Sequence, residues 1–234
     1  STPKPSSAAS DVYKRQDGTA FSTITAMMIK AVFFDLYHTL VRYEPPREQL
    51  QARALKDFGI EVNPETLHRP LIAADEYIYQ EIANASLSQR SKEEQTAVWA
   101  QYERIMLTEA GIEADDQLIF GLLDKMKQLD MKLVLFDDVV PALTDLKKRG
   151  LILGLISNVD QDISSLLHNL GLADLLQVVV TSSDVGFNKP RPEIFQEAVK
   201  RAGVQAAEAI YVGDQYLIDV LGAGKAGMKG ILLD

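Results

Sequence analysis

The feature of this sequence that most constrains its fold is a set of short apolar runs that are nearly continuous rather than alternating. Five of them have strand character, at residues 29–35, 151–157, 177–182, 209–214 and 229–234. Continuous hydrophobicity is typical of parallel strands that are covered on both faces. Helical patterns that end in glycine lie at 139–150, 161–171 and 191–203. The alternation predicts a doubly wound α/β fold around a mainly parallel, Rossmann-like sheet.

More than 110 residues separate the first run from the second, and most of them are helical in pattern. We expect helices near 46–58, 64–84, 91–110 and 115–129. An insertion of this size is a domain rather than a loop. The expected solvated positions are Arg53, Lys56, Arg104 and Glu109, and the expected apolar faces comprise Leu50, Ala54, Leu55, Ile72, Ile82, Val98, Trp99, Ile105, Met106, Leu118 and Leu122.

The chain divides by pattern into an extension at 1–27, an α/β core at 28–43 and 136–234, and an inserted helical domain at 44–135. The extension is rich in Ser, Thr, Ala and Pro, and its stretch VYKRQ resembles translated adapter sequence. We therefore expect part of it to be non-native, with MMIK as the start. The chain stops at GILLD, directly after an apolar run, and we therefore expect the reading frame to be truncated.

Composition excludes several classes of function. The net charge is −9 and the pI is about 4.9, which argues against binding to nucleic acid or to an anionic membrane. The chain has no cysteine, so disulfides, thiolate metal sites and thiol nucleophiles are excluded. No apolar run reaches the ~18 residues that a membrane span needs. We expect a cytoplasmic protein, and its oligomeric state is not predicted.

Polar side chains follow the predicted strands at the points where these strands end. The set comprises Asp35 and Thr39, Ser157 and Asn158, Lys189, and Asp214 and Asp219. In open α/β sheets, ligands bind at the carboxyl ends of the strands. We therefore expect these side chains to surround one crevice.

The charges of that crevice indicate a metal. Three aspartates and one lysine leave an excess of negative charge, and carboxylates forced together repel or protonate. A hard divalent cation relieves the repulsion, and a set of oxygen ligands without His or Cys suits Mg²⁺. With the metal counted, the site could accept a small anionic substrate, whose phosphoryl oxygens Lys189 and Ser157 could hold.

This ordered set resembles the haloacid dehalogenase (HAD) superfamily of hydrolases. FDLYHTL is similar to the first motif of that family, LISN to the second, KPRPEIF to the third and YVGDQYLID to the fourth. The inserted helices match the cap that some members carry between the first and second motifs. The resemblance runs over nearly the whole chain from Met28.

The resemblance implies a role for each matching residue. Asp35 would be the nucleophile and a Mg²⁺ ligand, with Asp214 and Asp219 as further ligands. Thr39 and Ser157, with Asn158 beside it, would position the phosphoryl group, and Lys189 would steady Asp35 and the substrate. Cap residues would select the substrate, and we name Tyr43, His68, Arg69 and Tyr77 as candidates.

Tyr37 departs from the pattern of the family's phosphatases, which have an aspartate at this position as general acid and base. Tyr37 keeps the backbone carbonyl that binds the metal and loses the carboxylate. The loss of positioned acid–base help costs roughly 10²–10⁴-fold in rate. His38 is the nearest titratable substitute, and the Tyr37 hydroxyl is a weaker one.

Three functions remain open. The first, which we favour, is a Mg²⁺-dependent phosphatase acting through an aspartyl-phosphate. The second is a 2-haloacid dehalogenase, because those enzymes resemble FDxYGTL at this loop and their halide needs no proton; Arg69 could then bind substrate. Against it, the chain keeps Gly213, Asp214 and Asp219 and has Phe195 where dehalogenases have Tyr. The third is a catalytically silent binding module.

Overall fold

The structure is a computed structural model that describes residues 28–233. Its main sheet has five parallel strands in the order β5-β4-β1-β6-β7, which confirms the predicted fold class. The strands are β1 (Ala31–Phe34), β4 (Ile152–Ser157), β5 (Val178–Thr181), β6 (Ala209–Gly213) and β7 (Lys229–Leu232). The prediction for residues 1–27 lies outside the described part of the chain.

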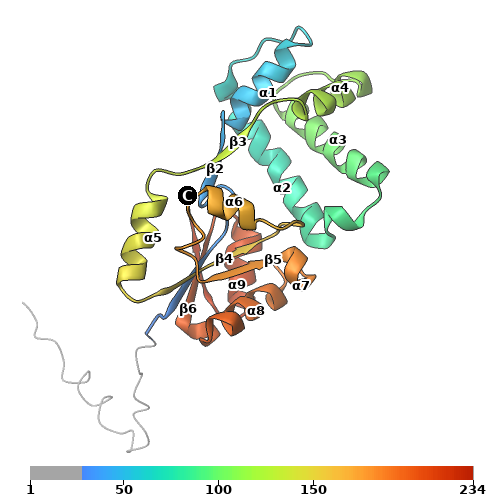
Figure 1. The fold of residues 1–234 in the computed structure, drawn as a ribbon. Coiled ribbons are helices and arrows are strands. Elements are labelled where there is room, and N and C mark those ends of the chain that lie inside the picture. The colour runs from blue at the N-terminus through green and yellow to red at the C-terminus, as the bar shows by residue number, and fades with distance from the viewer. Residues whose placement is uncertain (1–27, 234) are drawn as a thin grey trace, which may run out of the picture.

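The helices separate into two groups along the chain, as Figure 1 shows. One group belongs to the insertion: α1 (Arg47–Lys56), α2 (His68–Asn84), α3 (Lys92–Glu109) and α4 (Asp116–Met126), with short 3₁₀ turns η2 (Pro64–Leu67) and η3 (Leu87–Gln89). The other group accompanies the sheet: α5 (Val139–Lys148), α6 (Ser164–Asn169), α7 (Ser182–Val185), α8 (Pro192–Ala202), α9 (Leu221–Lys225), the 3₁₀ turn η4 (Ala206–Glu208) and the π-helix η5 (Tyr216–Val220).

Both faces of the sheet are buried, and β1 shows why its sequence is continuously apolar. Val32 and Phe34 point to a cluster that includes residues of α5 and α6, such as Leu143 and Leu167. Ala31 and Phe33 belong to a second cluster with residues of α8 and α9. Successive side chains of a strand point to opposite faces, so a strand covered on both sides is apolar at every position.

A close approach inside the sheet explains one glycine in strand β4. Gly154 pairs with Phe33 across the β1–β4 register. A Cβ atom at position 154 would lie 2.5 Å from the Phe33 ring and 3.0 Å from the Val178 carbonyl oxygen. Glycine is therefore the residue that lets the large Phe33 side chain pack fully buried beneath β4.

The inserted helices have a hydrophobic core of their own, built from residues such as Leu55, Leu71 and Met106. Most of the predicted apolar positions lie in it or against it. Three do not. Leu50 is buried but is not part of this cluster, whereas Ile72 and Trp99 are 45% and 41% exposed, so the assignment of Ile72 and Trp99 to the core was wrong. Both follow the helical period but lie at the edge of the apolar stripe, where sequence periodicity does not define its width.

Two strands that the sequence did not predict connect the sheet to the inserted helices. They are β2 (Val41–Glu44) and β3 (Lys132–Leu135), which pair antiparallel and lie between the two helix groups in Figure 1. We refer to the helices α1 to α4 as the cap and to the rest as the core. The boundary expected at 43/44 cuts through β2, the one expected at 135/136 falls at the end of β3, and the division into domains stays a proposal.

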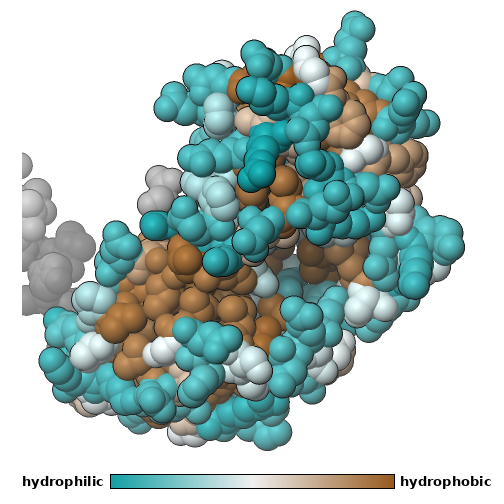
Figure 2. All heavy atoms as spheres, turned by 45° about the horizontal axis from the view of Figure 1, so that its top comes forward, coloured by the Kyte–Doolittle hydropathy of each residue, from teal (hydrophilic) through white to brown (hydrophobic). Residues whose placement is uncertain are grey.

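The surface is not uniformly polar. Figure 2 shows a broad hydrophobic area on the lower lobe and mostly hydrophilic residues over the upper lobe. Exposed apolar side chains at the carboxyl end include Leu217, Ile231 and Leu232. No helix in the described part of the chain is long and apolar enough to cross a membrane.

Candidate active site

The fold brings together the polar residues that the sequence placed at strand ends. Asp35 directly follows β1, Ser157 is the last residue of β4, and Asp214 directly follows β6. Asp219 lies on η5, four residues after Gln215, whose backbone N–H donates to Asp219 Oδ2 at 3.0 Å. Asp35, Asp214 and Asp219 each offer an oxygen within 4.8 Å of the others, which makes them a group that could hold a metal ion.

Lys189 is the centre of the hydrogen-bond network. Its Nζ donates to Asp35 Oδ1 at 2.7 Å, to Asp219 Oδ1 at 2.7 Å and to the Tyr211 hydroxyl oxygen at 2.8 Å. The ammonium therefore uses all three of its protons. Lys189 is 2% exposed, so the charge is sealed among these groups. Burial lowers its pKa, but Asp219 and Asp35 outweigh burial and raise it, which keeps Lys189 charged.

Tyr211 is a member of this network that sequence reasoning missed, because it stands inside an apolar strand. Its hydroxyl accepts from Lys189 and donates toward the Ile156 carbonyl oxygen at 3.0 Å, and it also lies 3.1 Å from Asp219 Oδ1. Its ring packs edge-on against Phe195, with 5.2 Å between the ring centroids. A tyrosine that is completely buried in a parallel strand signals a buried polar partner.

Asp35 keeps one oxygen free. Its Oδ1 accepts from Lys189, and no residue between 28 and 233 donates a hydrogen bond to Oδ2. Burial raises the pKa of Asp35 to about 7, against the lowering effect of Lys189. Burial also raises the pKa of Asp214. The protein groups alone thus leave both carboxylates short of positive charge, as expected where a cation completes the site.

Gly213 is required by the approach of η5 to the end of β6. A Cβ atom at position 213 would lie 2.3 Å from Asp219 Oδ2. Any side chain there would push Asp219 away from Lys189. The glycine before Asp214 therefore allows the two acidic residues of the fourth motif to share one site.

The loop after β1 is tightly folded. His38 adopts a left-handed backbone conformation with φ of 58°, and its N–H donates to the Val41 carbonyl oxygen at 2.8 Å. Thr39 is 5% exposed, and among the described residues its Oγ1 has no hydrogen-bond partner. An unsatisfied buried hydroxyl costs about 1–3 kcal/mol. Its presence beside Asp35 is consistent with a ligand that supplies the missing partner.

Asn158 fixes the segment that carries Lys189. Its Oδ1 accepts from the Lys189 backbone N–H at 2.6 Å, and its Nδ2 donates to the Lys189 carbonyl oxygen at 3.0 Å. This two-way contact holds the Lys189 backbone against the end of β4. Ser157 is 1% exposed and lines the cavity described next.

A cavity of about 850 Å³ lies over this network and extends into the cap. Its core part includes Asp35, Tyr37, His38, Ser157, Asn158, Lys189 and Asp219. Its cap part is mainly aromatic and aliphatic and includes Leu71, Ile78, Tyr79, Trp99, Tyr102, Leu123 and Met126, and Tyr43 of β2 lines the cavity as well. A volume of this order accommodates a substrate considerably larger than inorganic phosphate.

Only one of the four expected substrate residues lines this cavity. Tyr43 does, whereas His68, Arg69 and Tyr77 do not. His68 lies on the cap surface, where Nδ1 is 2.9 Å from Glu48 Oε1, and Arg69 is exposed. The cavity therefore gives no support to a substrate role for these three positions, which face away because α2 turns other residues toward the core.

Two polar pairs in the cap part were not predicted. The Arg47 guanidinium donates to both oxygens of Asp75, each at 2.7 Å, and the Tyr102 hydroxyl donates to Asp75 Oδ1 at 3.2 Å. Gln51 Nε2 donates to Glu103 Oε2 at 2.7 Å. Helical periodicity alone treats all five positions as ordinary helix residues, so the sequence carried no signal for these contacts.

The two rings beside Asp35 differ in protonation. Burial raises the pKa of Tyr37 to about 12, so its hydroxyl keeps its proton at neutral pH. Burial, together with the Arg47 charge, lowers the pKa of His38, so its imidazole is neutral there. Tyr37 also stacks on Tyr43, with 6.3 Å between the ring centroids.

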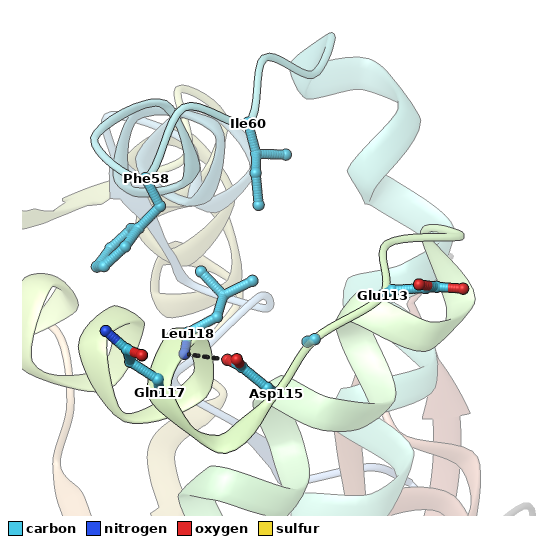
Figure 3. A pocket seen from close by; sticks show the side chains of 7 residues that line it. Phe58, Ile60, Glu113, Asp115, Gln117 and Leu118 are labelled. Atoms are coloured by element: carbon cyan, nitrogen blue, oxygen red, sulfur yellow. Dashed lines mark hydrogen bonds between the residues drawn. The ribbon is translucent and has the colours of Figure 1, made fainter.

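A second hollow lies away from these residues, in the cap. Figure 3 shows its lining side chains, among them Phe58, Ile60, Asp115 and Leu118. Asp115 Oδ1 accepts from the Leu118 backbone N–H at 2.9 Å, so this carboxylate caps helix α4. The Asp115 carboxylate of this hollow thus serves the local fold.

Three clustered carboxylates and a buried lysine lie at the carboxyl edge of a parallel sheet, beneath a substrate-sized cavity, and could hold a metal ion beside an anionic substrate. Residues 29–227 match the haloacid dehalogenase-like hydrolase family, and the chain belongs to that family. The protein is therefore a hydrolase, and its predicted membership of this family is confirmed.

Similar proteins align with most of the chain. It is 29% identical to the human haloacid dehalogenase-like hydrolase domain-containing protein 3 over 88% of this chain and 82% of that protein. It is 31% identical to a glyceraldehyde 3-phosphate phosphatase of Methanopyrus kandleri, over 86% and 82%. The solved L-2-haloacid dehalogenase RSc1362 shares the fold, with a TM-score of 0.60 and 24% identity over 88% and 87%.

Proposed function

We propose that this protein is a Mg²⁺-dependent phosphatase that acts on a small phosphorylated metabolite. The observation that carries this proposal is the group formed by Asp35, Asp214 and Asp219, whose oxygens lie within 4.8 Å of one another around Lys189. Two of the three carboxylates have raised pKa values, which a divalent cation would lower. The named relative that hydrolyses a phosphorylated sugar aldehyde supports the same class.

The carboxylates differ in how they would hold the metal. Both oxygens of Asp219 already accept hydrogen bonds, from Lys189 and from the Gln215 backbone. Asp35 and Asp214 each have an oxygen that no described residue occupies, so they are better placed for direct ligation. The backbone carbonyl of Tyr37 is the further expected ligand. The bound metal would neutralise charge on the phosphoryl group.

The chain's own residues would perform the transfer in two steps. Asp35 Oδ2 attacks phosphorus, forming the Asp–O–P bond while the bond from phosphorus to the leaving oxygen breaks. Water then attacks phosphorus, the Asp–O–P bond breaks, and Asp35 and inorganic phosphate are released. Thr39 and Ser157 would donate hydrogen bonds to the phosphoryl oxygens, and Lys189 would hold Asp35 in place and ionised.

Proton handling is the altered part of this mechanism. A neutral His38 can accept a proton from water in the second step. In the first step neither ring offers an acidic proton, because the pKa of Tyr37 is about 12 and His38 is already neutral. The leaving group must therefore depart with little help, which favours substrates whose leaving alcohol is itself acidic.

A 2-haloacid dehalogenase is the second candidate, and Tyr37 is the observation that favours it. A departing halide needs no proton, so the absence of an acid would be harmless. Two features favour the phosphatase instead: Asp214 and Asp219 crowd Asp35 with negative charge, and Arg69 is exposed outside the cavity. If the protein were a catalytically silent binding module, the buried network around Lys189 would have no catalytic function.

A paired assay tests the proposal. Phosphate release from a panel of phosphomonoesters and halide release from 2-haloacids are each measured with Mg²⁺ and with chelator. We expect phosphate release that needs Mg²⁺ and is lost in Asp35→Asn. Halide release that persists in chelator would overturn the proposal in favour of the dehalogenase. Absence of both activities, with the fold intact by circular dichroism, would favour the binding module.

A further inference from the structure

The cap part of the cavity contains a buried carboxyl that the proposed mechanism does not use. Glu103 lies on α3, is 3% exposed and lines the cavity. Its Oε2 accepts from Gln51 Nε2 at 2.7 Å. No residue between 28 and 233 donates a hydrogen bond to its other oxygen, Oε1, and none forms an ion pair with it. Carboxylates are almost never this buried unless they are paired.

The arginine that lines the cap part of the cavity is already engaged. Arg47 gives both terminal nitrogens of its guanidinium to Asp75 at 2.7 Å, so this pair is neutral as a unit. Lys92 and Lys127 also line the cavity but are exposed to solvent, which screens their charges. Glu103 is therefore a carboxyl in an apolar wall whose counter-charge the described part of the protein does not supply.

A purely structural role explains the bond to Glu103 Oε2 but not the presence of an acid at this position. The bond from Gln51 ties α1 to α3, and an uncharged amide at position 103 would accept the same bond. Burial raises the pKa of Glu103 to about 7, against the lowering effect of the Gln51 bond, so the protein bears a cost for keeping an acid here. A ligand that brings a cation to Oε1 would remove this cost.

We propose that Glu103 is a specificity-determining residue that binds a protonated amine on the substrate's leaving group. The inference rests on the proposed phosphatase function. The phosphoryl group would lie at Asp35 and Lys189, and the ammonium would lie in the cap beside Glu103. Substrates of the enzyme would thus be phosphate monoesters of amino alcohols.

The walls between the two ends agree with this ligand. Tyr79, Trp99 and Tyr102 line the cap part of the cavity, together with aliphatic side chains. Aromatic faces attract ammonium groups, with about 0.5–2 kcal/mol for each contact. Aliphatic residues such as Leu71 and Ile78 suit the carbon chain that joins the two charged ends.

The test uses matched esters and one isosteric variant. Alkyl phosphates of increasing chain length are prepared with a terminal amine, a terminal hydroxyl or a terminal methyl group. We expect kcat/KM of the unaltered protein to be about 10–100-fold higher for the amine at the best length, the value of a charge-assisted hydrogen bond. In Glu103→Gln this preference should disappear through KM while the fold is retained.

A control variant separates this role from general charge. Glu109 lies on the same helix but is exposed, and Glu109→Gln should retain the full amine preference. Equal kcat/KM for amine, hydroxyl and methyl esters in the unaltered protein would overturn the inference. So would an amine preference that persists in Glu103→Gln, because it would assign the ammonium to another site.

A binding measurement keeps the inference testable if turnover fails. Aminoalkyl and alkyl phosphonates, which cannot be hydrolysed at the phosphorus–carbon bond, are titrated into the unaltered protein and into Glu103→Gln by calorimetry. Tighter binding of the aminoalkyl phosphonate that depends on Glu103 would support the inference even if no ester is hydrolysed, an outcome that would overturn the phosphatase proposal alone. Equal binding of the two phosphonates would overturn the inference.

Discussion

The buried acid of the cap makes a quantitative prediction about stability. The pKa of Glu103 is raised by burial from an ordinary 4.5 to about 7. Between these two values the unfolded chain has released the proton and the folded chain retains it, so the unfolded state binds fewer protons and stability falls as pH rises. A difference of about 2.5 pH units corresponds to about 3 kcal/mol at 1.36 kcal/mol per unit. Below pH 4.5 both states are protonated and the penalty vanishes.

Replacement of Glu103 by Gln removes the titration and keeps the shape and the bond from Gln51. We therefore expect the two proteins to have the same free energy of unfolding near pH 4.5. The variant should become progressively more stable than the unaltered protein up to pH 7 and stay about 3 kcal/mol more stable at pH 8. Urea unfolding at a series of pH values measures this difference. The single tryptophan, Trp99, lies four residues before Glu103 on α3, so its fluorescence reports on the cap.

The pH dependence of the stability difference, rather than its size, tests whether the pKa of Glu103 is raised. A stability difference between the two proteins that is constant from pH 4.5 to pH 8 would refute the raised pKa, whatever its size. Glu109→Gln provides the baseline, because this exposed residue on the same helix should give no comparable change over that range.

Three further changes probe the network around Asp35. Thr39→Val removes a buried hydroxyl that has no partner among the described residues, so thermal unfolding should show a protein up to about 1–3 kcal/mol more stable. The value of kcat should fall about 10²-fold in the same variant. A loss of stability would contradict the reasoning. Tyr211→Phe deletes the hydroxyl between Lys189 and Ile156 and should cost about 1–3 kcal/mol by urea unfolding, with a normal curve refuting its place in the network. Lys189→Met leaves two buried carboxylates unpaired and should lower the free energy of unfolding by about 3–5 kcal/mol. Mg²⁺ should restore a part of this stability in a thermal melt. Stabilisation by Mg²⁺ that is no larger than in the unaltered protein would argue against a shared metal site.

The core half of the site could be predicted because strand ends define it. In a parallel sheet the carboxyl ends of the strands meet at one edge, so an apolar run that ends in Asp35 and another that ends in Asp214 must converge. Sequence spacing then places Lys189 and Ser157 at the same edge. The strand Tyr211 was missed because a hydroxyl within an apolar run is indistinguishable from ordinary core until its partner is known.

The cap half could not be predicted in the same way. A helix presents a different residue every 100° around its axis, and the face that closes on the core depends on packing between helices. Arg69 and Tyr77 were reasonable choices by type, yet α2 directs Asp75 and Tyr79 to the cavity instead. The strands β2 and β3 have only four residues each. Polar residues interrupt β2, so no continuous apolar run indicated it, whereas the run of three apolar residues in β3 is too short to distinguish a strand from a buried helix segment.

Tyr37 determines which leaving groups the first step can release. With a pKa of about 12 for Tyr37 and a neutral His38, the first step lacks a proton donor, so its rate should depend steeply on the acidity of the leaving alcohol. A plot of log kcat/KM against leaving-group pKa for a series of aryl and alkyl phosphates should therefore have a strongly negative slope. Tyr37→Asp should flatten it, raising the rates of poor leaving groups by up to about 10²–10⁴-fold and leaving good ones nearly unchanged. A flat plot for the unaltered protein would show that another group supplies the proton and that Tyr37 limits nothing.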